Sequence, residues 1–274
     1  MKLFANQKTL DLSTPQIMGI LNFTPDSFSD SGQFFQLDKA LFHVEYMINA
    51  GAAIIDIGGE STRPMAEEVS LDEELSRVVP LVDAIHQRFD CWISVDSSKP
   101  EIMYEAAQVG MDIINDIRAL NEKNALQMAV DLALPVCIMH MQGQPRTMQT
   151  APQYHDVVAE VRSFLSEKIE QCLQAGVKKE NLILDPGFGF GKSVEHNYSL
   201  LKELNQFCSM GYPVLAGLSR KSMLGAILDK PVEQRLIGSV TSALIAAQKG
   251  AKILRVHDIA ETADALKIWQ ATEQ

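Results

Sequence analysis

Short runs of apolar residues, each closed by a polar residue or a glycine, recur along the whole chain. Each run has four to six residues, the usual length of a β-strand, and is largely apolar at consecutive positions. This pattern predicts strands buried on both faces, as in a parallel sheet covered by helices. Eight of these runs occupy residues 17–22, 53–58, 91–96, 111–116, 135–140, 182–185, 213–217 and 252–257.

Segments with apolar residues three and four positions apart lie between these runs, which is the spacing of an amphipathic helix. Gly51, Gly110, Gly176 and Gly250 close four of the segments, and glycine commonly follows the end of a helix. The predicted helices cover residues 37–50, 71–89, 100–109, 123–131, 154–175, 193–208, 236–249 and 260–271. Every predicted strand is therefore followed by a predicted helix.

Strict alternation of strand and helix implies parallel strands joined by right-handed crossovers. Eight such units in 274 residues predict an α/β fold, the (β/α)8 TIM barrel. A doubly wound open sheet is the alternative. It is disfavoured because polar residues end nearly all the runs, whereas an open sheet gathers its ligand at one switch point.

The first residues predict a small addition to the barrel. Two short apolar segments, residues 3–5 and 9–12, are separated by polar residues and predict a hairpin within residues 1–14 that covers the barrel. No Pro/Ser-rich linker or charge run divides the rest of the chain. Residues 1–274 are therefore predicted to form a single domain.

Composition narrows the possible partners. A net charge of −11 argues against a nucleic acid or a membrane surface as partner, so an anionic ligand needs a local cluster of basic residues. Without a signal-peptide pattern or an apolar run of membrane-spanning length, the chain is expected in the cytoplasm. The cysteines stand far apart and are expected to be reduced thiols, either buried or incidental.

The carboxyl ends of the strands build the active site of a TIM barrel. Two carboxylates and an amide, Asp96, Asn115 and Asp185, end three strands and suit a planar heterocycle edged with N–H donors. Metal ligation is a weaker alternative, because no second acid completes a cage around these three residues. The polar residues at the strand ends are Asn22, Thr62, Arg63, Asp96, Asn115, His140, Asp185, Ser219, Arg220, Lys221, Arg255 and His257.

Basic residues gather after the last two strands, where TIM barrels frequently bind phosphate. Arg255 and His257 are two residues apart on a strand and share one face. This grouping predicts an anion site. The alternatives are an ion pair of Arg255 with Asp258 or Glu261, and a helix cap for His257.

The glycine-rich residues 184–192 follow a buried strand and let the backbone approach a ligand closely. They fit neither a phosphate loop nor a dinucleotide fingerprint, and the alternative is that Asp185 caps the next helix. Two further loops, residues 22–32 and 58–65, are longer than their connections need and are predicted lids. Asn22 could offer a carbonyl oxygen to a Mg²⁺ carried by a phosphate-bearing substrate.

Eight motifs, spread over nearly the whole chain, together resemble the bacterial dihydropteroate synthase family. They are NFTPDSFSD (residues 22–30), GGESTRP (58–64), VDSSK (95–99), INDI (114–117), MHM (139–141), LDPGFGFGK (184–192), SRKS (219–222) and RVHD (255–258). The two lid loops and the last motif are individually specific. Small departures occur: Ser31 and Met65 replace common glycines, and Ser97 a common threonine, so Met65 could stiffen the second lid.

The resemblance implies an enzyme that condenses p-aminobenzoate with (7,8-dihydropterin-6-yl)methyl diphosphate, giving 7,8-dihydropteroate and diphosphate. It further implies a homodimer and a Mg²⁺ ligated in part by Asn22. By the same resemblance, the pterin would be held by Asp96, Asn115, Asp185 and Lys221, and the diphosphate would be faced by Thr62, Arg63, Arg255 and His257. The p-aminobenzoate site would be shaped by Phe28, Pro64, Phe190 and Ser222. The residues acting at the reacting centre would be Phe28, Asp30, Arg63 and Lys221.

Two other interpretations remain open. A pterin-binding methyltransferase on a related barrel resembles this chain around Asp96, Asn115 and Asp185 but gives no reason for the basic cluster. A catalytically silent barrel that binds a metabolite or a partner protein predicts gaps in the set of polar strand-end residues, and none is apparent.

Overall fold

Eight parallel strands form the centre of the computed structural model, which describes residues 1–23, 33–60, 69–143, 148 and 152–273. Neighbouring strands pair in the order β8-β7-β6-β5-β4-β3-β10-β9. The strands are β3 (Gln16–Asn22), β4 (Ile54–Gly58), β5 (Trp92–Asp96), β6 (Ile113–Asp116), β7 (Val136–Met139), β8 (Leu182–Asp185), β9 (Leu215–Ala216) and β10 (Ile253–Val256).

The sheet closes on itself beside its shortest strand, β9. A parallel bridge joins Leu184 of β8 to Val214, the residue before β9, and the Leu184 N–H donates to Pro213 O at 2.9 Å. The predicted TIM barrel is confirmed, and the open doubly wound sheet is wrong.

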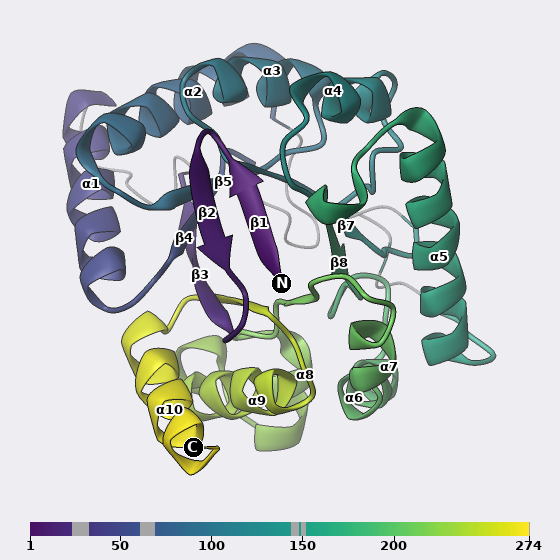
Figure 1. Cartoon of the computed structure of the whole chain (residues 1–274). Helices are drawn as coiled ribbons and strands as arrows, with labels where there is room; N and C mark the ends of the chain where they lie inside the picture. The colour runs from purple at the N-terminus through teal and green to yellow at the C-terminus, as the bar shows by residue number, and fades with distance from the viewer. Residues whose placement is uncertain (24–32, 61–68, 144–147, 149–151, 274) are drawn as a thin grey trace.

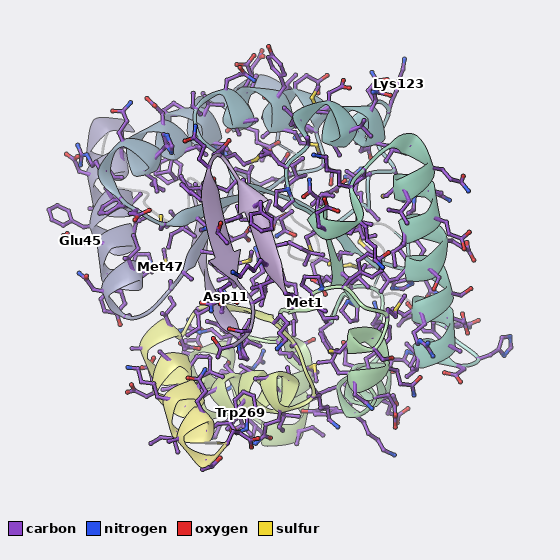
Figure 2. All side chains as sticks on the ribbon, in the orientation of Figure 1. Met1, Asp11, Glu45, Met47, Lys123 and Trp269 are labelled. Carbon is purple, nitrogen blue, oxygen red and sulfur yellow. The ribbon has the colours of Figure 1, made fainter. Side chains whose placement is uncertain are left out.

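Helices form a ring around the strands (Figure 1). They are α1 (Gln33–Asn49), α2 (Leu71–Arg88), α3 (Pro100–Gln108), α4 (Ala125–Leu132), α5 (Val157–Ala175), α6 (Val194–Lys202), α7 (Asn205–Cys208), α8 (Ser222–Leu228), α9 (Leu236–Gln248) and α10 (Ile259–Thr272), with 3-10 turns at Lys179–Asn181 and Val232–Gln234. Helices α1, α2, α5, α9 and α10 contact the strands directly. On α1, for example, Met47 points toward the strands and is fully buried, whereas Glu45 points away (Figure 2).

Two parts of the helix prediction are wrong. The single helix predicted over residues 193–208 is divided into α6 and α7 by a turn at Glu203 and Leu204, and this turn allows both Leu204 and Phe207 to be fully buried. The short helix α8 was not predicted, because its seven residues are too few to show a clear helical period.

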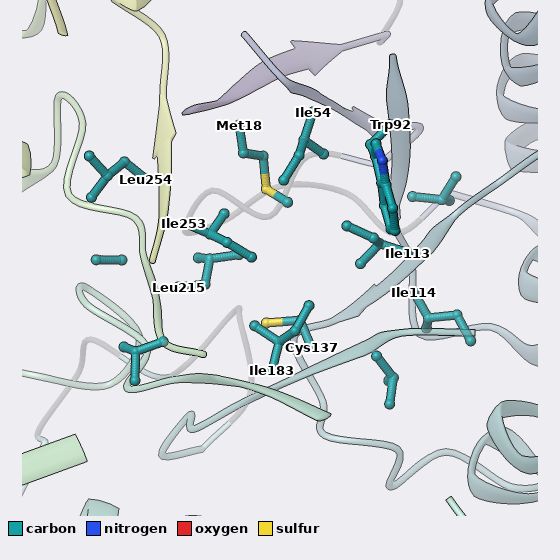
Figure 3. Close-up of a cluster of buried hydrophobic side chains, with 14 of the residues drawn as sticks. Met18, Ile54, Trp92, Ile113, Ile114, Cys137, Ile183, Leu215, Ile253 and Leu254 are labelled. Carbon is teal, nitrogen blue, oxygen red and sulfur yellow. The ribbon is translucent and has the colours of Figure 1, made fainter. Parts of the chain in front are cut away.

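The barrel interior has an apolar layer and, toward the carboxyl ends of the strands, a polar layer. Figure 3 shows the side chains of the apolar layer gathered between the strands. Successive residues of a strand point to opposite faces, so the residue two positions further on points inward again. The apolar layer includes Ile54, Trp92, Ile113, Ile183 and Ile253, and the polar layer that follows them contains Asp56, Ser94, Asn115, Asp185 and Arg255.

The predicted N-terminal hairpin is present as the antiparallel strands β1 (Lys2–Ala5) and β2 (Lys8–Asp11). Lys8 Nζ donates to Cys91 O and to Asp112 Oδ2, both at 2.9 Å, and Asn6 Nδ2 donates to Asp112 Oδ1 at 3.0 Å. Cys91 and Asp112 directly precede β5 and β6. The hairpin therefore lies across the amino ends of the strands (Figure 1), opposite the polar layer.

Candidate active site

Asp56 is the centre of the polar layer and is fully buried. Its carboxylate accepts hydrogen bonds from Ser94 Oγ at 2.6 Å and from Asn115 Nδ2 at 3.2 Å. Arg255 Nε donates to Asp56 at 2.7 Å, and Arg255 Nη2 donates to Asp96 at 2.9 Å. One guanidinium thus holds carboxylates from β4 and β5, and the Asp56 carboxylate holds the Asn115 amide on β6.

Sequence reasoning missed Asp56 and Ser94, because both lie inside predicted strands rather than at their ends. Strand alternation could have found them. Asp56 stands two residues after Ile54, and Ser94 stands two residues before Asp96, so each shares the inward face of its strand.

Asp185 ends β8 and begins the glycine-rich loop of residues 186–191. Its Oδ1 accepts a hydrogen bond from the Gly187 N–H at 2.7 Å. Gly187 has φ +72°, and a Cβ at this position would overlap the carbonyl oxygen of His140. Only glycine fits there without strain. The alternative that Asp185 caps the next helix is wrong, since Ser193 caps α6.

Lys221 immediately precedes α8 and faces the glycine-rich loop. Its ammonium donates to Phe188 O and lies 4.6 Å from the centre of the Phe190 ring. Ser222 follows as the first residue of α8 and is exposed. The structure therefore brings together Asp185, Phe190 and Lys221, as the sequence predicted.

Burial shifts the pKa values of Asp96, Asp185 and Lys221 so that the neutral form of each is favoured. It raises the pKa of Asp96 to about 7, against the opposing charge of Arg255. It also raises the pKa of Asp185, and it lowers the pKa of Lys221 to about 8 although the Asp185 carboxylate opposes that change. Desolvated groups with pKa values near neutrality are characteristic of binding and catalytic sites.

His257, just after β10, contacts Ser219, which follows β9. The Ser219 hydroxyl lies 3.0 Å from His257 Nδ1 and accepts the His257 backbone N–H at 3.2 Å. The helix-cap alternative for His257 is wrong, because Asp258 occupies the N-cap position of α10. The alternative in which Arg255 pairs with Asp258 or Glu261 is also wrong. Arg255 pairs with Asp56 and Asp96, and Asp258 pairs with Arg220.

Asn22 lies at the carboxyl end of β3, beside Gly58 of β4. The Phe23 N–H donates to Gly58 O at 2.9 Å, and a Cβ built on Gly58 would lie 3.7 Å from Asn22 Oδ1. Within the described residues, no group of three His, Cys, Asp or Glu side chains could hold a metal ion. The predicted residues Phe28, Asp30, Ser31, Thr62, Arg63, Pro64 and Met65 lie outside the described residues.

Two general expectations concern the rest of the chain. All four cysteines are unpaired, and Cys91, Cys137 and Cys172 are buried as predicted. Among the helices that the structure describes, none is long and apolar enough to cross a membrane.

A closed (β/α)8 barrel with carboxylates, an amide and basic groups at the carboxyl ends of its strands defines a class of TIM-barrel enzymes that recognise small polar molecules. A family model described as "Pterin binding enzyme" matches residues 18–257. The chain therefore belongs to the pterin-binding enzymes.

Individual relatives narrow the family further. The dihydropteroate synthase of Haemophilus influenzae is 74% identical over 272 residues, which cover 99% of this chain and 99% of that protein. The dihydropteroate synthase of Yersinia pestis, solved with a sulfonamide drug, has a TM-score of 0.95 at 55% identity and covers 100% of this chain and 99% of its own. The dihydropteroate synthase of Xanthomonas albilineans, in complex with 7,8-dihydropteroate, has a TM-score of 0.91 at 44% identity. The match covers 100% of this chain and 99% of that chain. The chain belongs to the dihydropteroate synthases, enzymes that transfer a pterinylmethyl group.

Proposed function

We propose that this chain condenses p-aminobenzoate with (7,8-dihydropterin-6-yl)methyl diphosphate at the carboxyl end of its barrel, releasing 7,8-dihydropteroate and diphosphate. The observation that carries the proposal is the buried set of Asp96, Asn115 and Asp185, which end three strands of one closed barrel. The related Xanthomonas albilineans enzyme, whose structure contains 7,8-dihydropteroate, supports the same ligand class.

The pterin is held by groups that match its polar edge. Asp96 and Asp185 accept hydrogen bonds from its amino and ring N–H groups, since carboxylates bind paired N–H donors well. The Asn115 Nδ2 already donates to Asp56, so its Oδ1 is left to accept from the ligand. Lys221 supplies a donor from the opposite side.

The diphosphate is met by Thr62, Arg63, Arg255 and His257. Arg255 acts there as a positive charge that also holds the Asp56 and Asp96 carboxyl groups in place. Mg²⁺ fits this site as an ion that travels with the substrate, because Mg²⁺ binds through few protein oxygens and completes its shell with phosphates and water. Asn22 would be its ligand from the chain, and the ion would neutralise charge on the departing diphosphate.

The reaction breaks the C–O bond between the pterin methylene and the diphosphate and forms a C–N bond to the arylamine, which loses a proton. The electron-rich pterin ring delocalises positive charge on the methylene, so we favour departure of diphosphate before attack. Asp96 and Asp185 stabilise that charge as preorganised carboxyl groups whose oxygens face the ring. Phe28, Pro64, Phe190 and Ser222 would line the arylamine site, with Phe28, Asp30, Arg63 and Lys221 around the reacting centre.

Product formation by the purified chain tests the proposal. With (7,8-dihydropterin-6-yl)methyl diphosphate and Mg²⁺ present, we expect diphosphate release that requires p-aminobenzoate, forms dihydropteroate and stops when EDTA removes the metal. Asp185→Ala should lower kcat/KM for the pterin substrate about a hundredfold, as expected for loss of one preorganised contact. Asp264→Ala, on the exposed surface of α10, is the matched control and should leave it unchanged.

The pterin-binding methyltransferase alternative gives a different result in the same assay. It predicts tight binding of the pterin without release of diphosphate, and that outcome would contradict the proposal. The basic residues Lys221, Arg255 and His257 favour the synthase, because a methyl group carries no charge that they would neutralise.

We also propose that residues 1–274 act as one domain, in the cytoplasm and as a homodimer. The four unpaired cysteines suit a reducing compartment.

Exposed apolar side chains on adjacent elements support a partner surface, with Ile227 on α8 66% exposed, Ile237 on α9 72% exposed and Ile268 on α10 72% exposed. A second copy is the partner proposed because the family implies a homodimer. Leu244 and Ile245 on α9 and Trp269 on α10 pack against the core.

A further inference from the structure

The residues of the family motifs that have no part in the function described so far include His140, in the motif of residues 139–141, and Lys192, which ends the motif of residues 184–192. The structure joins them. Lys192 is only 3% exposed, and its Nζ lies 2.9 Å from Nδ1 of the His140 ring. A lysine buried to this degree is uncommon and needs several hydrogen-bond partners.

The other partners of Lys192 belong to the glycine-rich loop and to the strand beside it. Its Nζ donates to Gly187 O at 2.8 Å, to Phe190 O at 3.0 Å and to His140 O at 3.3 Å. The N–H groups of Lys192 are therefore shared among three carbonyl oxygens and one ring nitrogen. Lys192 ties the beginning and the end of the loop to the carboxyl end of β7.

Side chains also bond to three further backbone groups of the loop. Asn197 Oδ1 accepts the Gly189 N–H at 2.7 Å, the Tyr154 hydroxyl donates to Gly191 O at 2.8 Å, and Lys221 donates to Phe188 O. None of the strands in the described part of the chain pairs with the loop, so these side chains take the place of a β-ladder in defining its conformation.

His140 is held as a neutral acceptor for this arrangement. Burial, together with the Lys192 charge, lowers the pKa of His140 to about 3. The ring packs edge-on against Phe164, with centroids 4.9 Å apart. His140 therefore presents a fixed nitrogen to Lys192 instead of acting as an acid or base near neutral pH.

We propose that Lys192 and His140 are positioning residues that hold the loop of residues 186–191, and through it the Phe190 ring and the Lys221 ammonium, in the geometry that binds p-aminobenzoate beside the pterin. The inference rests on the proposed function. Lys192 acts through Gly187 and Phe190, because its own N–H groups are all directed at the loop and at His140.

Kinetics of Lys192→Met in the full chain test the inference. Methionine keeps most of the buried volume and removes the donors, so the loop loses its central support. We expect kcat/KM for p-aminobenzoate to fall by about tenfold to a hundredfold, mainly through KM, as small misplacements of a site commonly do. The KM for the pterin substrate should change much less. Lys202→Met, at the exposed end of α6, is the matched control and should behave like the wild type.

A pair of His140 variants separates positioning from general damage to the fold, and serves if Lys192→Met does not fold. His140→Asn keeps an acceptor near the Nδ1 position and should retain most of the activity with p-aminobenzoate, whereas His140→Leu should show the defect of Lys192→Met. Hydrogen exchange of residues 186–191, measured without substrate, should be faster in Lys192→Met and in His140→Leu than in the wild type.

Equal kinetics and equal exchange in Lys192→Met and Lys202→Met would overturn the inference, as would equal defects in the two His140 variants. Wild-type turnover distinguishes this failure from failure of the proposed function. If the wild type makes no dihydropteroate, the proposed function is wrong and the catalytic part of the inference is wrong with it. If the wild type is active and Lys192→Met matches it, only the inference is wrong.

Discussion

Asp96 and Lys221 have pKa values shifted by burial more than by their charged partners. Asp96 and Lys221 shift in opposite directions, the acid upward and the base downward, because low solvent exposure disfavours both charged forms. Arg255 restrains the shift of Asp96, and Asp185 restrains that of Lys221. Both groups thereby ionise close to neutral pH, where small changes in the site alter their charge.

The pH dependence of kcat/KM for the pterin substrate follows from Lys221. A lysine is cationic below its pKa, so Lys221, with a pKa of about 8, loses its charge above that pH, and kcat/KM should fall there. Lys221→Arg keeps its charge at all accessible pH values, so the fall near pH 8 should disappear even if the variant is slower. Lys202→Arg is the control and should keep the wild-type profile. A fall at the same pH in Lys221→Arg would show that another group titrates.

At the scale of secondary-structure elements, the N-terminal hairpin and the polar layer occupy opposite ends of the barrel. The hairpin is attached through Lys8 and Asn6 to Asp112, whose side chain is fully buried and also accepts the Ile93 N–H at 2.9 Å. A buried carboxylate that loses a partner keeps its desolvation cost. The hairpin should therefore matter for stability and not for chemistry.

Lys8→Met tests this separation of stability from activity. Removing the ammonium leaves Asp112 with fewer donors, and the free energy of unfolding should fall by about 1–3 kcal/mol. Lys2→Met, on the exposed side of the same hairpin, should leave stability unchanged. Urea denaturation measures the free energy of unfolding. The value of kcat should be the same for both variants and the wild type. A loss of kcat in Lys8→Met alone would contradict the assignment of the hairpin to the end opposite the site.

For the whole molecule, the unevenly distributed apolar surface is the feature that bears on assembly. Ile227 and Ile237 lie on α8 and α9, and a Cβ on Gly238 would touch Leu228, so the end of α8 and the start of α9 are adjacent. Helix α9 also packs against α10, which carries the exposed Ile268. An apolar surface of this kind on neighbouring helices is typical of a protein–protein interface.

Ile237→Glu should shift the proposed homodimer toward monomer. A charged side chain at the centre of an apolar interface is desolvated without a partner, which weakens association strongly. Phe42→Glu, on the equally exposed surface of α1, is the control and should leave the dimer intact. Sedimentation at a series of concentrations measures both. A monomeric wild type would contradict the proposal, and a dimer unaffected by Ile237→Glu would place the interface elsewhere.

Much of the fold was predictable because its main signals are local. Predicted strands alternate with predicted helices along the chain, and this order implies parallel strands. The position of Asp96, Asn115 and Asp185 at the ends of predicted strands was enough to indicate the site. The division between α6 and α7 was not predictable, because Leu200, Leu204 and Phe207 keep a helical spacing across the turn. Only packing against the core distinguishes the two arrangements.

The ion-pair partners of Arg255 could not be predicted from the sequence and became apparent only in the tertiary structure. From sequence alone, the carboxylates near it in the chain, Asp258 and Glu261, were the natural candidates. Closure of the barrel places β10 beside β3, with β4 and β5 next in order, so Arg255 meets Asp56 and Asp96 instead, 199 and 159 residues away in the chain. Sequence by itself determined the barrel, its polar strand ends and its family. Tertiary structure alone decided which charges meet, because the pairing of buried charges depends on distances that only the closed sheet sets.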